Sequence, residues 1–157
     1  MTTTTTKAEI FKFSAITNYE ISKEDLIDLL ITAGQGISYW GQVYVNFEPN
    51  KQYEQGYLKI EREGGIYINT NKLDYQSGLF CLDYNCFETD EKPEIINTKS
   101  IKDFIDTIKL IIESPNTKGS LKNSIIDSLA SKDYGYLDAS DMDYIMQKTI
   151  FGKCVYS

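Results

Sequence analysis

The chain has 157 residues, of which 41 % are hydrophobic and 25 % are charged. This length suits a single domain with one core, and neither fraction is typical of a disordered or membrane-spanning chain. With 23 acidic and 16 basic residues the formal charge is −7, which argues against binding to free nucleic acid or to an anionic membrane surface.

Met1 is followed by five threonines, and we expect residues 1–7 to form a flexible lead. Residues 8–157 are expected to form a single α+β domain. A first strand is expected from Glu9 to Ile16. The start lacks the basic residues and the long apolar run of a signal peptide, and no run is long enough to span a membrane. We therefore expect a protein of the cytoplasm.

The stretch from Ser22 to Phe47 predicts one capped helix and one strand. Ser22 and Asp25 have the spacing of an N-terminal capping pair, and apolar residues then recur with the helical period. Gly34 and Gly36 are expected to end the helix, because glycine readily adopts the positive φ of a helix end. From Ile37 to Phe47 the chain alternates with the period of a strand.

A hairpin is expected next. Residues 57–63 and 66–69 alternate on either side of Gly64 and Gly65, a pair typical of tight turns between antiparallel strands. Together with the strand over 37–47 they predict a sheet of at least three strands. Residues 71–97 show no clear period, and residues 79–84 fit either a short buried strand or a turn of helix.

Helices are expected in the last third of the chain. Ser100 and Asp103 repeat the capping pair, and an apolar stripe continues to Ser114. A second helix is marked over residues 121–129, and a third should open at Ser140 and end before Gly152. Strands early and helices late predict an α+β fold, with an antiparallel sheet of three to five strands and three helices packed on one face.

The residue types present narrow the chemistry. There is no histidine, so neither a Ser-His-Asp nor a Cys-His centre is possible. Cys81, Cys86 and Cys154 lack the spacing of a zinc site, and we interpret them as thiols of the core. The sequence predicts no cofactor.

Two further patterns have a chemical and a structural interpretation. Asp138, Asp141 and Asp143 form an oxygen-rich cluster of the kind that binds calcium or magnesium, but the glycine and distal glutamate of a calcium loop are missing. Acidic residues in a first helical turn explain the cluster better, so no metal site is predicted. Gly34 and Gly36 superficially match a phosphate-binding loop, yet they follow a helix instead of preceding one, which favours a helix end and close backbone packing.

Aromatic residues make up 13 % of the chain, and they provide the candidate binding residues. Tyrosine combines a large contact area with a polar tip, which suits interfaces. The candidates for contact with a ligand or partner are Tyr39, Trp40, Tyr44, Arg62 and Tyr67. Tyr39, Trp40 and Tyr44 are expected on both faces of one strand, where they either fill the core or form a contact patch, and Arg62 could bind a carboxylate or phosphate.

Four short segments resemble a group of small uncharacterised proteins encoded by phages, plasmids and their integrated remnants. They are residues 1–6, 34–40, 137–143 and 151–156, which hold a threonine-rich start, Gly-Gln-Gly-Ile-Ser-Tyr-Trp, Asp-Ala-Ser-Asp-Met-Asp and Phe-Gly-Lys-Cys-Val-Tyr. The resemblance implies an origin in mobile DNA and carries no catalytic residue.

These features together favour a non-enzymatic accessory protein of a phage or mobile element, which acts by binding and inhibits a host defence protein. The partner expected is thus a host protein, inside an infected or element-carrying bacterium. An alternative is an oligomer that binds a nucleotide signal between Arg62, Trp40 and nearby tyrosines. A third hypothesis is a metal-dependent hydrolase that uses Asp138, Asp141 and Asp143, and it ranks last.

Overall fold

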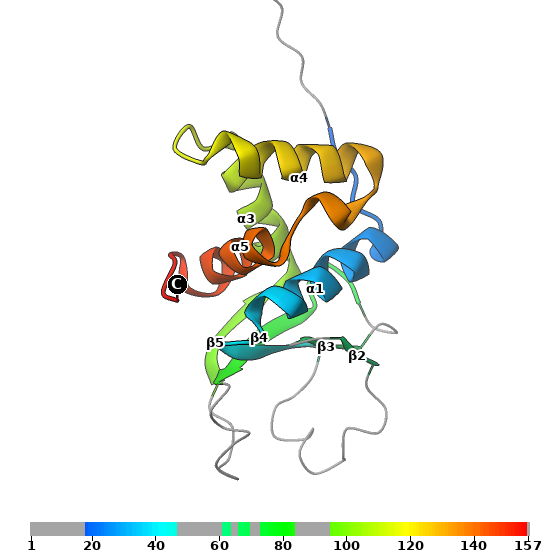
Figure 1. The fold of residues 1–157 in the computed structure, drawn as a ribbon. Coiled ribbons are helices and arrows are strands. Elements are labelled where there is room, and N and C mark those ends of the chain that lie inside the picture. The colour runs from blue at the N-terminus through cyan, green and yellow to red at the C-terminus, as the bar shows by residue number, and fades with distance from the viewer. Residues whose placement is uncertain (1–17, 47–60, 64–65, 70–72, 84–94, 157) are drawn as a thin grey trace, which may run out of the picture.

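The structure, a computed structural model, describes residues 18–46, 61–63, 66–69, 73–83 and 95–156 (Figure 1). The strand expected over Glu9–Ile16, the Gly64-Gly65 turn and Cys86 lie outside these residues. The elements in chain order are α1 (Lys23–Ile37), β1 (Gly41–Val45), β2 (Glu61–Glu63), β3 (Ile66–Ile68), β4 (Gly78–Asp83), β5 (Ile95–Ser100), α3 (Ile101–Glu113), α4 (Gly119–Ser131), the short 3₁₀ helix η4 (Tyr134–Tyr136) and α5 (Ala139–Phe151).

The five strands form one sheet in the order β2-β3-β1-β4-β5, and the α+β class predicted from the sequence is confirmed. The hairpin is also confirmed, since β2 pairs antiparallel with β3 and Glu63 lies opposite Ile66. The segment over residues 79–84 fitted either a strand or a helical turn, and its described part, residues 79–83, lies in the strand β4. The strand β5, which follows it in the sheet, was not predicted.

The sheet is mixed, and the prediction of an antiparallel sheet was wrong at one pairing. β1 and β3 run parallel, with Val43 opposite Ile66, whereas β1 and β4 are antiparallel. The outcome depends on which strand of the hairpin lies beside β1. The charged sequence Glu-Arg-Glu of β2 suits the edge of the sheet, and the apolar sequence Ile-Tyr-Ile of β3 suits an interior position. The strand β3 therefore lies next to β1, and the two strands run in the same direction.

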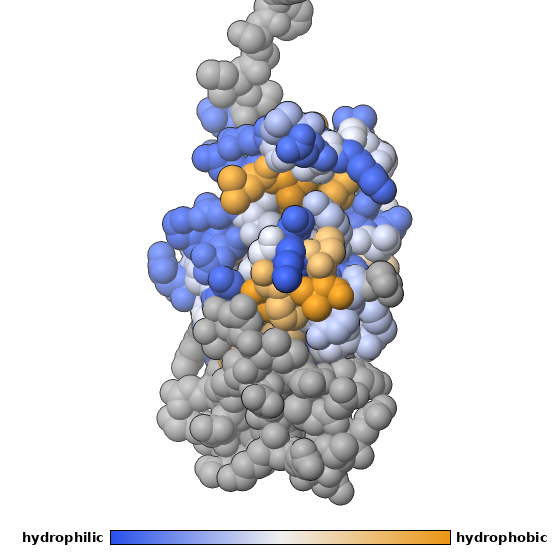
Figure 2. Space-filling model, turned by 90° about the vertical axis from the view of Figure 1, so that its left-hand side faces the viewer, coloured by the Kyte–Doolittle hydropathy of each residue, from blue (hydrophilic) through white to orange (hydrophobic). Residues whose placement is uncertain are grey.

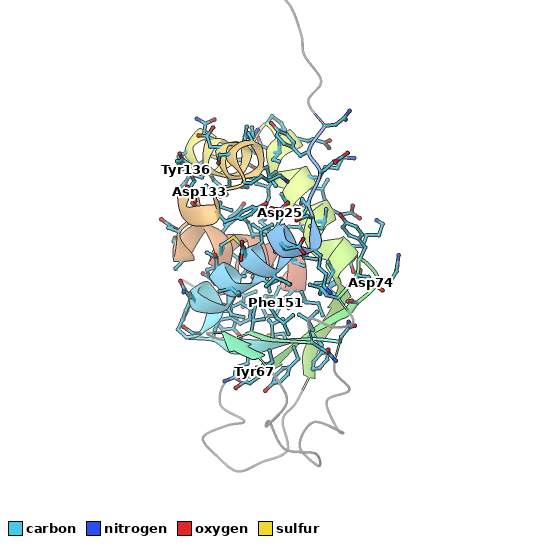
Figure 3. All side chains as sticks on the ribbon, turned by 90° about the vertical axis from the view of Figure 1, so that its right-hand side faces the viewer. Asp25, Tyr67, Asp74, Asp133, Tyr136 and Phe151 are labelled. Carbon is cyan, nitrogen blue, oxygen red and sulfur yellow. The ribbon has the colours of Figure 1, made fainter. Side chains whose placement is uncertain are left out.

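The four α-helices of the described residues were all expected from the sequence, and all four lie on one side of the sheet, where three were expected (Figures 1 and 3). α1 and α5 pack next to each other and contact the sheet, and α4 packs on α3 on the side away from it. The core fills the space between sheet and helices. Its largest fully buried apolar side chains include Leu29, Phe104, Met142 and Ile145. None of the helices among the described residues is long and apolar enough to cross a membrane.

Two of the three predicted helix starts are confirmed in atomic detail. Ser22 and Asp25, and likewise Ser100 and Asp103, form reciprocal capping boxes in which each side chain bonds the backbone N–H of the other. The last helix starts earlier than expected. Its N-cap is Asp138, whose carboxylate accepts the backbone N–H of Asp141 at 2.7 Å.

The expected end of the first helix was wrong, although close packing at its glycines is confirmed. α1 continues through Gly34 and Gly36 to Ile37, and β1 starts at Gly41 instead of Ile37. A Cβ atom on Gly36 would lie 2.3 Å from the carbonyl oxygen of Ala139 and 2.9 Å from the backbone nitrogen of Asp143. Gly36 is therefore required by the close approach of α1 and α5.

Candidate functional site

The turn between α1 and β1 carries two of the predicted binding residues, Tyr39 and Trp40. They precede the strand and do not straddle it as expected. Trp40 is buried in the core cluster, at 4 % exposure, whereas 53 % of Tyr39 is exposed. Trp40 thus anchors the turn in the core, and Tyr39 presents an aromatic ring at the surface.

Both side chains bond to the same carboxylate on α5. The Tyr39 hydroxyl donates to Oδ2 of Asp143 at 2.9 Å, and the Trp40 indole N–H donates to Oδ1 at 2.6 Å. A third donor, the amide of Gln147, reaches Oδ2 at 2.9 Å. An ionised carboxylate accepts several hydrogen bonds at once, and charged acceptors strengthen them, so Asp143 fixes the geometry of the turn.

Gln147 connects this carboxylate to the end of the chain. It is 1 % exposed, and its Oε1 accepts the backbone N–H groups of Val155 at 2.6 Å and Tyr156 at 2.8 Å. Its Nε2 also donates to the carbonyl oxygen of Tyr156 at 3.1 Å. We call residues 153–156 the C-terminal strap, because this single buried amide binds their main chain against α5.

Aromatic stacking completes the attachment of the strap. The Tyr156 ring lies parallel to Trp40, at 5.2 Å between centroids and 7° between planes, and Phe151 contacts both rings edge-on or tilted. Stacked pairs of this kind are worth about 0.5–1.5 kcal/mol beyond the area they bury. The result is an aromatic cluster that ties the turn after α1 and the strap to α5.

The environment of Tyr39 keeps its hydroxyl protonated. Partial burial, together with the hydrogen bond to Asp143 and the negative charge of that carboxylate, raises the pKa of Tyr39 to about 12. The phenol therefore remains a hydrogen-bond donor to the carboxylate across the neutral pH range. This phenol is held as a donor and is far from the ionised form that a general base requires.

Two other predicted residues, Tyr44 and Tyr67, lie on the opposite face of the sheet. Tyr44 of β1 is opposite Tyr67 of β3 and Phe80 of β4, and its ring stacks on both, with centroids 4.6 and 5.6 Å apart. Figure 3 shows Tyr67 on the side of the sheet away from the helices. All three rings are buried, so the row consists of packed aromatic residues of the sheet.

The predicted site residues therefore fall into two separate places. Arg62 lies on the edge strand β2 opposite Tyr67, and its side chain is outside the described part of the structure. Tyr39 and Trp40 lie together beside α5, away from Tyr44 and Tyr67. Among the described side chains, Tyr39 and Trp40 thus lie apart from Tyr44 and Tyr67, and the nucleotide pocket of an oligomer stays a prediction.

The structure brings into the site several residues that sequence reasoning missed: Asp143 in this role, Gln147, Phe151 and Tyr156. Asp143 was interpreted as a helix-starting residue, and nothing local distinguishes it from Asp138 and Asp141. Its partner Tyr39 is 104 residues away in the sequence. Residues 34–40, 137–143 and 151–156, three of the segments singled out in the sequence, contact one another at this site.

The acidic cluster lies at the start of α5. Asp138 caps α5. The pKa of Asp141 is raised above its ordinary value, mainly by burial and to a lesser extent by the charge of Asp138. No group of three or more potential metal ligands occurs among the described side chains. Cys81 is buried, as predicted for a core thiol, but Cys154 in the strap is exposed, so the prediction was wrong for that residue.

A second polar cluster joins the start of α1 to the end of α4. Lys132, which ends α4 with a positive φ of 58°, contacts Asp25 at 2.7 Å and also bonds the carbonyl oxygen of Glu20. Burial acts to raise the pKa of Asp25, but the hydrogen bonds from Lys132 and Ser22 outweigh it and lower the pKa to about 2. Every group here has a structural partner, and we assign the cluster to stability.

The surface near the strap carries exposed apolar and aromatic side chains. Val155 is 50 % exposed and Tyr156 is 37 % exposed, next to the exposed ring of Tyr39. Figure 2 looks onto the side of the molecule where the C-terminus lies and shows apolar patches between hydrophilic areas. We call Tyr39, Val155 and Tyr156 the strap surface.

No family model matches the chain, and no curated protein and no solved structure matches it either.

Proposed function

We propose that this protein acts by binding another protein through the strap surface, as an accessory protein of a phage or mobile element that inhibits a host defence protein. The observation that carries the proposal is the preorganised exposure of Tyr39. Its ring stands at the surface while its hydroxyl is fixed by Asp143, which is itself fixed by Trp40 and Gln147.

Preorganisation matters because association costs free energy for every side chain that must be ordered. An interface side chain that becomes immobilised costs about 0.5–1.5 kcal/mol, and a ring that is already fixed avoids much of this cost. Tyrosine is enriched among the residues that dominate binding energy, where a large apolar ring ends in a polar group. The strap surface has this composition.

The charge of the chain favours a particular kind of partner. A formal charge of −7 attracts basic surfaces and accelerates encounter with them, while it repels acidic surfaces. The proposed partner is therefore a host protein with a basic surface next to an apolar or aromatic contact.

A phage plaque assay tests the proposal. The full chain is co-expressed in bacteria that each carry a different defence system, and plaque formation is compared with and without it. We expect the protein to restore plaques on at least one defended strain, and the Tyr39→Ala variant to lose the effect. If the chain protects phage against none of the systems and binds none of their proteins, the proposal is wrong.

Tyr75 provides a matched control. It is also exposed, at 48 %, and its hydroxyl also makes one hydrogen bond, to the carbonyl oxygen of Ile21. Ile21 lies just before α1 and Tyr39 just after it, so the two tyrosines are separated by the helix length of about 22 Å. Tyr75→Ala should retain plaque restoration, and equal loss in both variants would contradict a site at Tyr39.

A further inference from the structure

The way in which Gln147 binds the strap resembles the way in which proteins bind peptides. Its amide accepts two successive backbone N–H groups and donates to one carbonyl oxygen, so three main-chain groups of Val155 and Tyr156 are bound by one side chain. Main-chain hydrogen bonds of this kind give affinity to an extended peptide independently of its side chains. The only strap side chain with a ring partner is Tyr156, which stacks on Trp40.

The site and the strap differ sharply in burial. Trp40 and Gln147 are 4 % and 1 % exposed, and both belong to the packed interior. All four strap residues are exposed, and none of them is part of the core cluster. Detachment of the strap would thus remove no residue from the core cluster, but it would take from the Gln147 amide its three bonds to Val155 and Tyr156 and leave it only the bond to Asp143.

We propose that Trp40, Asp143, Gln147 and Phe151 form a peptide-binding notch, that the strap occupies this notch within the same chain, and that an extended, aromatic-bearing segment of the protein partner displaces it. The proposal rests on the proposed function: of the strap surface the partner keeps contact with Tyr39, and its own segment replaces Val155 and Tyr156 in the notch. The partner segment bonds to Gln147 through its main chain and stacks an aromatic ring on Trp40.

A partner segment fits this role better than the strap of a second copy. A tethered segment has an effective concentration in the millimolar range, and a second copy's strap makes the same contacts without that advantage. A partner segment gains further contacts at the exposed ring of Tyr39, which lies beside the notch and which the strap leaves open to solvent. Basic residues flanking its aromatic ring would also match the net negative charge of this chain.

Fluorescence of Trp40 tests the notch directly, because it is the only tryptophan in the chain. In the full-length Tyr156→Ala variant the ring that stacks on Trp40 is removed, while the main-chain bonds to Gln147 are retained. We expect a red shift of the emission. The synthetic peptide acetyl-Lys-Ser-Val-Tyr-Ser-amide, which carries the strap sequence with serine for cysteine, should reverse the shift at millimolar concentration.

The peptide with alanine for tyrosine is the matched control and should not reverse the shift. A variant that keeps the size of the buried side chain, Gln147→Met, should weaken peptide binding at least tenfold in the Tyr156→Ala background, and circular dichroism confirms that it is folded. If Gln147→Met fails to fold, a measurement on the wild type takes the place of this variant. Hydrogen exchange of the Val155 and Tyr156 backbone amides with solvent is then followed by NMR, and we expect slow exchange at both. If the peptide leaves the emission unchanged, the notch does not bind peptides.

Once a partner is found, the change in its affinity for the Tyr156→Ala variant tests whether the strap is displaced. If the strap is displaced, Tyr156→Ala removes a competitor and should tighten partner binding several-fold, whereas Tyr39→Ala should weaken it. If the partner instead docks on an attached strap, Tyr156→Ala weakens binding, and displacement is wrong although the proposed function holds. Failure to find any partner in the plaque assay would contradict the proposed function without affecting the peptide measurement.

Discussion

The substitution Gly36→Ala separates helix propensity from tertiary packing, because the two predict opposite signs. In an isolated helix, alanine is more favourable than glycine by about 1 kcal/mol. In this protein, the added Cβ would meet the carbonyl oxygen of Ala139 at 2.3 Å and the backbone nitrogen of Asp143 at 2.9 Å. Both atoms are backbone and cannot rotate away, so α1 and α5 must move apart.

The size of the effect follows from that displacement. An ordinary carbon contact is about 3.5 Å or more, so a carbon 2.3 Å from a fixed backbone oxygen forces the helices roughly 1 Å apart. Overpacking of this kind typically costs about 1–3 kcal/mol or more, and here it also disturbs the bonds to Asp143. We expect Gly36→Ala to lower the free energy of unfolding by about 2–3 kcal/mol after the gain in propensity, which is about 5–10 °C in Tm.

Urea unfolding followed by circular dichroism measures this change, with Gly119→Ala as the matched control. Gly119 is also a helical glycine, in the first turn of α4, and an added Cβ there meets nothing within 4 Å. This control should be neutral or slightly stabilising. If Gly36→Ala proves as stable as the wild type, the close approach of α1 and α5 is not as described and the reasoning is refuted.

Three further outcomes are expected. Asp143→Asn should destabilise the fold by about 1–3 kcal/mol in chemical unfolding and shift the emission of Trp40, because an amide cannot accept all the hydrogen bonds that the carboxylate accepts; unchanged emission would contradict it. Because the pKa of Asp25 is lowered to about 2 from 3.8, its bonds, including that with Lys132, stabilise the fold above about pH 4 and are lost as pH falls toward 2. Asp25→Asn should therefore remove about 1–2 kcal/mol of stability at neutral pH and flatten the loss between pH 4 and 2, measured by urea unfolding at each pH; parallel curves for both proteins would count against this. Ser100→Ala should cost about 1 kcal/mol in the same assay, since the capping box of α3 is lost, and no change would show that the cap is dispensable.

The sequence by itself determined the local elements wherever their signals lie within a few residues. The capping boxes at Ser22 and Ser100 depend on bonds between residues three apart, and the structure forms both. The amphipathic helices and the β2–β3 hairpin follow from the same short-range patterns of apolar and turn residues. The strand expected over 37–47, the hairpin and a run of helices were enough to identify the α+β class.

Only the tertiary structure decided how these elements meet. The signal for a hairpin does not by itself specify which of the two strands lies beside β1, and that choice made one pairing parallel. Glycine commonly ends helices, but Gly36 lies within α1. Position 36 requires glycine because the backbone of α5 is too close for a Cβ atom. Asp143 bonds Tyr39 and Trp40 from more than 100 residues away, and its role became visible only when α5 was packed against the end of α1. Such contacts depend on the shape complementarity of whole surfaces, which no short stretch of sequence encodes.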